Sequence, residues 1–180
     1  QPRLTIVLYP DDPVLSRGLL TGSDKPFPVG FGKSGVLPAG SSFRSGYSLL
    51  GTFRINAILS ADRFEMTESL IEQSGKSRDW LTKNLFSNMS SIDFDGDGEG
   101  GEYGDAFFSL EPVGSKAVQP FHFGEYKNTF RWYSYAIHGT QDEERIGKCI
   151  TGGCVNVSKA SVAKLLGVLK LGDTVLIQHP

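Results

Sequence analysis

The amino-acid sequence predicts a single, mainly β domain with a few short helices. Its 180 residues suit one domain, and they include twenty-two glycines and nine prolines. That balance favours short strands and many turns over long helices. We see neither an internal repeat nor a low-complexity linker, so residues 1–180 are expected to form one domain.

Several segments have the alternating or β-branched pattern of strands, namely residues 4–10, 51–59, 106–110, 129–137 and 173–179. The Pro- and Gly-rich residues 11–46 are expected to form loops or short strands. Apolar residues spaced three and four apart predict short helices over 67–73 and 77–86. Ser158 is expected to cap one further helix, which Gly172 ends.

Composition excludes some classes of function. The formal net charge is −2, and no basic stripe is present to neutralise a phosphate backbone, so nucleic acid is excluded as a partner. No apolar run approaches the ~20 residues that a membrane helix requires. The chain also opens without the pattern of a signal peptide, although a trimmed mature form would look the same.

A cysteine and a histidine are the strongest candidates for chemistry. Cys154 lies among glycines, and His138 stands at the end of a predicted strand with small Gly139 after it. The other histidines are His122, among aromatic residues, and His179, near the C-terminus. A histidine within hydrogen-bond reach would lower the pKa of the thiol by forming an ion pair. The alternative is a buried cysteine beside an unrelated loop histidine.

The segment "TGGC" at residues 151–154 supplies a second requirement of such chemistry. Glycines let backbone N–H groups approach a substrate carbonyl and donate to the oxyanion that forms on attack. The amide of Cys154, together with that of Gly153 or Gly152, is the expected donor pair.

Residues 137–157, "IHGTQDEERIGKCITGGCVNV", resemble the signature of the L,D-transpeptidase catalytic domain. That family has a histidine in an HGT-type turn, then about sixteen residues, then Ser/Thr-His-Gly-Cys. His138 and Cys154 are sixteen residues apart, and Thr151 occupies the Ser/Thr position. Asn156 matches the polar residue that follows the cysteine, whereas Gly152 replaces the second histidine of the family.

This resemblance implies an L,D-transpeptidase-like β-sandwich and a cysteine transpeptidase that acts on peptidoglycan tetrapeptide stems. Cys154 would be the nucleophile, His138 the base, and the Gly139 carbonyl the group that orients the imidazole. Transfer of the thioester to water would give L,D-carboxypeptidase activity. The resemblance further implies inhibition by carbapenems and other β-lactams, no organic cofactor, and a location outside the cytoplasm, in the periplasm or cell wall. The oxyanion and substrate region would comprise Gly152, Gly153, Thr151 and Asn156.

The departure at Gly152 keeps other hypotheses open. Glycine cannot donate a side-chain hydrogen bond beside the nucleophile, so a weakly active module that binds peptidoglycan is one alternative. An unrelated Cys–His peptidase that acts on other peptides is another.

An acidic, glycine-rich loop suggests a metal site. In "DFDGDGEGGEYGD" the residues Asp93, Asp95 and Asp97 occupy positions one, three and five of a calcium loop. Position twelve should be a bidentate Glu but is Gly104. The loop is therefore either a structural calcium site or a solvated acidic turn.

Three further residues have two interpretations each. Arg145 is either a contact for a substrate carboxylate or a partner in an exposed salt bridge. Tyr133 faces either a substrate groove or the core. Cys149 either forms a reversible disulfide with Cys154 or packs as a small hydrophobic residue.

Overall fold

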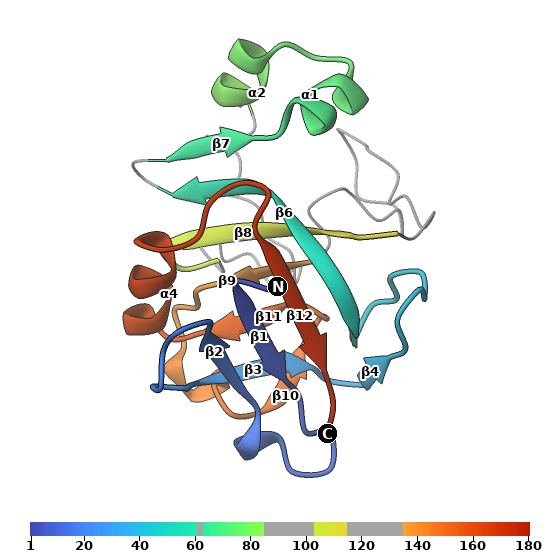
Figure 1. The fold of residues 1–180 in the computed structure, drawn as a ribbon, viewed down its shortest axis with the longest axis vertical. Coiled ribbons are helices and arrows are strands. Elements are labelled where there is room, and N and C mark those ends of the chain that lie inside the picture. Colours follow the sequence, from blue (N-terminus) through green and yellow to red (C-terminus); the bar gives the residue numbers. More distant parts are fainter. Residues whose placement is uncertain (61–62, 85–102, 115–134) are drawn as a thin grey trace.

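The computed structural model describes residues 1–60, 63–84, 103–114 and 135–180, and these residues form a mainly β fold (Figure 1). The strands are β1 (Leu4–Val7), β2 (Arg17–Leu20), β3 (Phe27–Gly32), β4 (Gly35–Leu37), β5 (Tyr47–Leu49), β6 (Gly51–Ser60), β7 (Phe64–Met66), β8 (Ala106–Pro112), β9 (Ala136–His138), β10 (Cys149–Thr151), β11 (Val155–Val157) and β12 (Thr174–Gln178). The helices are α1 (Glu68–Ser74), α2 (Arg78–Asn84) and α4 (Lys159–Leu166), with 3-10 turns η1 (Pro13–Leu15) and η2 (Glu143–Arg145). The expectation of many strands and few, short helices is confirmed.

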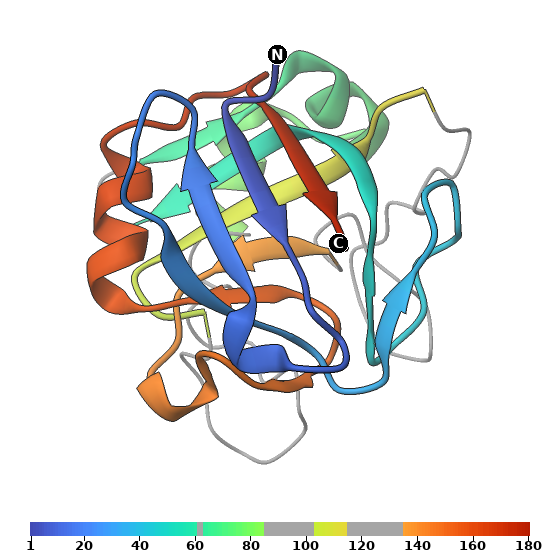
Figure 2. The ribbon, with the colours of Figure 1, turned by 60° about the horizontal axis from the view of Figure 1, so that its bottom comes forward.

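The main sheet closes on itself. Its strands are paired in the order β3, β11, β9, β8, β6, β12, β1 and β2, and β2 pairs again with β3. Figure 2 shows these strands surrounding a common interior, with α4 packed at one side. The expected two-sheet sandwich is not confirmed, because β3 bonds to neighbours on both edges and so joins what would otherwise be two sheets.

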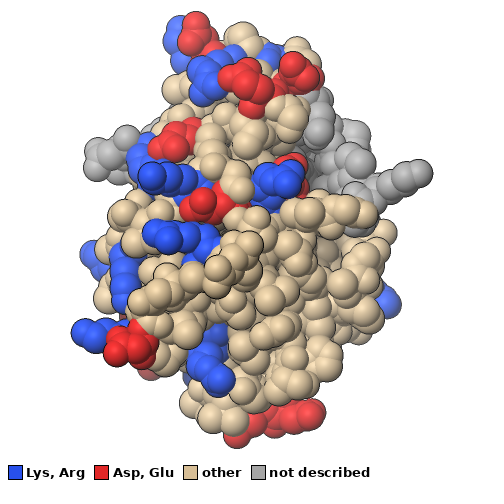
Figure 3. Space-filling view, in the orientation of Figure 1, with Lys and Arg blue, Asp and Glu red and all other residues tan. Residues whose placement is uncertain are grey.

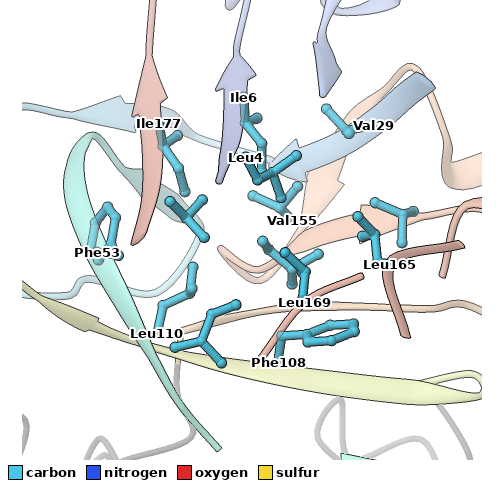
Figure 4. Close-up of a cluster of buried hydrophobic side chains, with 14 of the residues drawn as sticks. Leu4, Ile6, Val29, Phe53, Phe108, Leu110, Val155, Leu165, Leu169 and Ile177 are labelled. Carbon is cyan, nitrogen blue, oxygen red and sulfur yellow. The ribbon is translucent and has the colours of Figure 1, made fainter. Parts of the chain in front are cut away.

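Apolar side chains gather on both faces of this sheet. The barrel core contains buried residues from every strand of the ring and from α4, and Figure 4 shows part of it, including Leu4, Phe53, Phe108, Val155 and Leu165. An outer cluster lies on the opposite face of β6, β8 and β9, under α1 and α2. Its buried members are Ala57, Leu59, Met66, Leu70, Leu81, Tyr103, Phe107 and Ala136.

A β-bulge in β6 determines which of its side chains face the outer cluster. Ile55 pairs with Leu110 and Ala57 pairs with Ser109, so Asn56 is an extra residue on β6. Side chains alternate along a strand, and the extra residue shifts that alternation by one. Ile55 and Ile58 therefore both face the barrel core, whereas Ala57 faces the outer cluster.

The predicted helices are confirmed, with one wrong boundary. Thr67 caps α1 and Ser158 caps α4, each accepting a hydrogen bond from a backbone N–H in the first turn. However, α4 ends at Leu166 and Gly167 is its C-cap, so Gly172 does not end the helix. Gly167 has low helix propensity, and two residues later Leu169 is buried in the barrel core. Among the described residues, no helix has the length and apolarity needed to cross a bilayer.

Arg63, which precedes β7, joins the outer part of the fold to the end of α4. Its guanidinium donates to the carbonyls of Leu166 and Leu169 at 2.6 and 3.2 Å, and it pairs with Glu65 at 2.5 Å. The Leu166 carbonyl lacks a helical partner because it lies at the C-terminus of α4, and the Leu169 carbonyl lies three residues beyond it. Figure 3 shows that acidic and basic side chains mix over this part of the surface.

We expect Arg63→Ala to lower the free energy of unfolding by about 1–3 kcal/mol, because carbonyls at the end of α4 lose a charged donor. Glu65→Ala is the matched control. It removes the ion pair and leaves the carbonyl contacts, so it should cost less than about 1 kcal/mol. Urea unfolding of both variants checks the difference, and equal losses would contradict it.

Candidate active site

The pairing of β9 with β11 places the candidate nucleophile and base. The two strands run parallel, with Ile137 beside Val155 and His138 beside Asn156. Ile137 and Val155 face the barrel core, whereas Cys154 packs against the outer cluster. His138 is next to Ile137 and so faces the outer side. Cys154 and His138 therefore share one face, offset by roughly 7 Å along the strand direction.

His138 is held in one orientation by its neighbour. It is only 8% exposed, and its Nδ1 lies 2.6 Å from the carbonyl oxygen of Gly139. A carbonyl oxygen can only accept, so Nδ1 carries the proton and donates it. Nε2 of the neutral ring is then left with a lone pair, which is the state a general base needs.

Aromatic rings enclose the imidazole. The Tyr103 ring meets it edge-on with centroids 4.8 Å apart, and the Phe107 ring stacks on it at 6.2 Å. Gly139 permits this approach, since a Cβ there would lie 3.1 Å from the Tyr103 carbonyl oxygen. The sequence predicted neither ring, because Tyr103 lies within the acidic loop and Phe107 belongs to an ordinary strand pattern.

Burial sets the charge state of the pair. It lowers the pKa of His138 to about 4; the bond to Gly139 opposes this change and the charge of Arg145 adds to it. Burial also raises the pKa of Cys154 to about 12, and a backbone hydrogen bond with Ala136 opposes that rise. Both groups are therefore neutral near pH 7. Burial thus acts against the expected ion pair, because it disfavours the charged form of each group.

The turn from Gly152 to Cys154 is attached to the segment that includes β5. The Gly46 N–H donates to the Gly152 carbonyl at 2.8 Å, and the Ser48 hydroxyl donates to the Gly153 carbonyl at 2.6 Å. Ser48 is fully buried. The sequence offered no signal for this residue, which lies more than a hundred positions from Cys154.

Thr151 also forms hydrogen bonds within this turn. Its hydroxyl donates to the Cys154 carbonyl at 2.7 Å and accepts from the Gly153 N–H at 3.1 Å. The Gly153 amide, one of the expected oxyanion donors, is thus already bonded to a side chain. Thr151 is therefore placed to shape the turn.

The two glycines before Cys154 differ in their surroundings. Gly153 has a φ of 133°, and a Cβ there would lie 2.7 Å from the Tyr47 carbonyl oxygen and 2.9 Å from the Phe43 ring. Gly152 is exposed, and a Cβ there would meet no atom of the described residues within 4 Å. Gly153 is therefore required by the backbone, whereas Gly152 leaves open space.

The structure also places other predicted site residues. Asn156 is 2% exposed, and its Oδ1 has no hydrogen-bond partner among the described residues. Arg145, in η2, is partly buried and close enough to influence the pKa of His138. Tyr133 and the proposed calcium ligands Asp93, Asp95 and Asp97 lie outside the described residues.

The two cysteines are both free thiols. Cys149 pairs with Phe31 through β10 and packs against the barrel core, whereas Cys154 packs against the outer cluster. They therefore lie against different faces of the sheet, and Cys149 behaves as a small hydrophobic residue.

A cysteine thiol and a neutral histidine on one face of a closed sheet are the groups that a site of the Cys–His class requires. The sequence matches the family described as YkuD, the L,D-transpeptidase catalytic domain, over residues 19–177. The chain therefore belongs to the L,D-transpeptidase catalytic domain family.

A comparison with solved structures also finds matches. An L,D-transpeptidase from Mycobacterium smegmatis is 14% identical, with a TM-score of 0.44, and the match covers 98% of this chain and 59% of that one. L,D-transpeptidase 3 from Mycobacterium tuberculosis, solved with a faropenem-derived adduct, is 12% identical, with a TM-score of 0.49 and coverage of 98% and 60%. Bd1075 from Bdellovibrio bacteriovorus is 16% identical, with a TM-score of 0.44 and coverage of 98% and 48%. The chain thus spans between 48% and 60% of the length of these structures. A search of curated proteins finds no match.

Gly153→Ala should destabilise the protein by about 2–4 kcal/mol, because a side chain at positive φ is strained and would clash with the Tyr47 carbonyl. Gly152→Ala is the matched control, and we expect it to change the free energy of unfolding by less than about 0.5 kcal/mol. Chemical denaturation measures both. A cost for Gly152→Ala as large as that for Gly153→Ala would refute this description of the turn.

His138 should make the fold sensitive to acid. Above pH 6.5 the imidazole is neutral in both states and contributes nothing, whereas below it the unfolded chain takes up a proton that the folded chain does not. Stability should therefore fall by about 3 kcal/mol through His138 between pH 6.5 and 4. The His138→Gln variant has no imidazole to protonate at this position, so its free energy of unfolding relative to wild type should rise as the pH falls. A constant difference would show that the pKa is not lowered.

Proposed function

We propose that this chain is a cysteine-dependent L,D-transpeptidase that acts on peptidoglycan tetrapeptide stems outside the cytoplasm. Family membership supports the class of reaction, and the shared face of Cys154 and His138 supports the assignment of these two residues. The observation that carries the proposal is the neutral imidazole, whose Nδ1 is bonded to Gly139 and whose Nε2 is left to accept a proton.

The proposed first half-reaction forms a thioester. The Sγ of Cys154 attacks the carbonyl carbon after the third residue of the stem while its proton passes to Nε2 of His138. The tetrahedral intermediate then collapses, the carbon–nitrogen bond breaks, and the departing D-alanine amine takes the proton from the imidazolium. His138 is neutral again, and the stem is held on sulfur.

The second half-reaction uses the same groups in reverse order. An amine of a neighbouring stem attacks the thioester while His138 accepts its proton, and the thiol leaves with that proton restored. Water in place of the amine gives the carboxypeptidase outcome. No organic cofactor is required by either step.

Burial explains why the proton moves during attack and not before it. A thiol pKa of about 12 and an imidazole pKa of about 4 make a resting ion pair unfavourable. The base therefore acts when the thiol approaches the carbonyl and charge passes on to the oxyanion. A neutral thiol is also protected from unspecific oxidation.

Other residues contact the stem in this proposal. Arg145 is positively charged and lies close enough to His138 to lower its pKa, so in this proposal it binds a carboxylate of the stem. The unpartnered Oδ1 of buried Asn156 suits an N–H donor of the peptide. The calcium site at Asp93, Asp95 and Asp97 and the substrate contact of Tyr133 stay predictions.

A second candidate function is a stem-binding module with weak turnover. It is favoured by Gly152, which is exposed and provides no side chain where the family has a histidine. The intact pair of Cys154 and His138 favours the enzyme over this alternative.

A carbapenem should acylate Cys154, adding its mass to the intact protein. Cys154→Ala should form no adduct, and His138→Gln should acylate about 10²–10⁴-fold more slowly because the base is lost. Cys149→Ala is the matched control and should react like wild type, since its thiol packs against the barrel core.

Stem peptides distinguish the remaining alternatives. Release of D-alanine from a tetrapeptide stem by wild type, but not by Cys154→Ala, is the expected result. Folded protein that binds stems and neither releases D-alanine nor forms an adduct would be a binding module. Activity confined to peptides of L-residues would indicate an unrelated peptidase.

A further inference from the structure

We propose that Ser48 is a positioning residue for acyl transfer: its hydroxyl orients the Gly153–Cys154 peptide so that the Cys154 N–H is directed toward the oxyanion. This inference rests on the proposed function. It concerns a residue of β5, which lies outside the His138–Cys154 motif in the sequence.

The hydroxyl of Ser48 has a fixed direction. Its oxygen accepts from the Gly32 N–H at 2.9 Å and its proton goes to the Gly153 carbonyl at 2.6 Å. Ser48 is fully buried, so water does not compete for either bond. The single proton of this side chain is therefore committed to the turn that precedes the nucleophile.

The direction of one carbonyl sets the direction of the next N–H. The Gly153 carbonyl and the Cys154 N–H belong to the same planar trans peptide, in which the two groups point in opposite directions. The carbonyl points inward to buried Ser48, so the N–H points outward from it. Rotation of this peptide would turn the N–H away from a bound carbonyl.

The Cys154 amide is the relevant donor because the neighbouring Gly153 amide already has a hydrogen-bond partner. The Gly153 N–H already donates to Thr151, whose hydroxyl donates in turn to the Cys154 carbonyl. Among the amides expected to stabilise the oxyanion, that of Cys154 is the one whose orientation Ser48 controls.

Ser48 is itself held to the strand that carries the base. The hydroxyl of Tyr135, fully buried and three residues before His138, donates to the Leu49 carbonyl at 2.7 Å. This bond ties β5 to the chain entering β9. The positions of the oxyanion donor and of the base are thus set by one connected group of buried hydrogen bonds.

The test compares two reactions of the same thiol, in a Cys149→Ala background so that only Cys154 reacts. Acylation by a carbapenem passes through an oxyanion, whereas alkylation by iodoacetamide does not. Ser48→Val and Ser48→Thr are nearly isosteric and differ in the hydroxyl. We expect Ser48→Val to acylate about 10–100-fold more slowly than Ser48→Thr, with alkylation rates within about threefold of each other.

Ser16→Ala is the control for a general loss of stability. Ser16 is also buried, and its hydroxyl oxygen accepts from the Tyr9 N–H at 2.9 Å, in the segment between β1 and β2. The Ser16→Ala variant should have a lower melting temperature but the same ratio of acylation rate to alkylation rate as the parent protein. With stem peptide, Ser48→Val should reduce kcat and leave KM nearly unchanged.

Two results would overturn the inference while the proposed function stands. One is equal acylation of Ser48→Val and Ser48→Thr, and the other is a parallel loss of acylation and alkylation in Ser48→Val, which is what a purely structural role produces. Wild type that is alkylated but never acylated would instead refute the proposed function, and the role of Ser48 would fall with it.

Discussion

The candidate site depends on the parallel register of β9 and β11. Because Ile137 lies beside Val155, and both face the barrel core, the alternating residues on either strand face the outer side. That places His138, in β9, and Cys154, in the turn just before β11, on one surface. A shift of one residue in this register would turn one of them into the core.

On the outer face the imidazole of His138 is buried and the thiol of Cys154 is partly buried, and this burial sets their protonation states. Rings from Tyr103 and Phe107 surround the imidazole and exclude water from it. The same burial that stabilises neutral histidine also disfavours a thiolate at Cys154. In the proposed reaction the thiol therefore loses its proton during attack, which makes the direction of the oxyanion donors more important than the acidity of the thiol.

Two kinds of constraint hold the turn before Cys154. The backbone at Gly153 adopts a positive φ and packs against Tyr47, while Ser48 and Thr151 bind the carbonyls on either side of the nucleophile's amide. Gly152 takes part only through its backbone. The missing family histidine therefore leaves a gap at the surface and does not disturb the turn itself.

The sequence alone predicted several of the elements and singled out the candidate pair of His138 and Cys154. Alternation and capping residues predicted β1, β6, β8, β12 and the starts of the helices, because those signals are local, and the spacing of His138 and Cys154 identified the family. Only the tertiary structure decided the closure of the sheet at β3, the bulge at Asn56 and the neutral state of the pair. It also revealed the buried hydrogen bonds of Ser48. Each of these depends on contacts between distant segments, and on burial, which no local pattern of residues encodes.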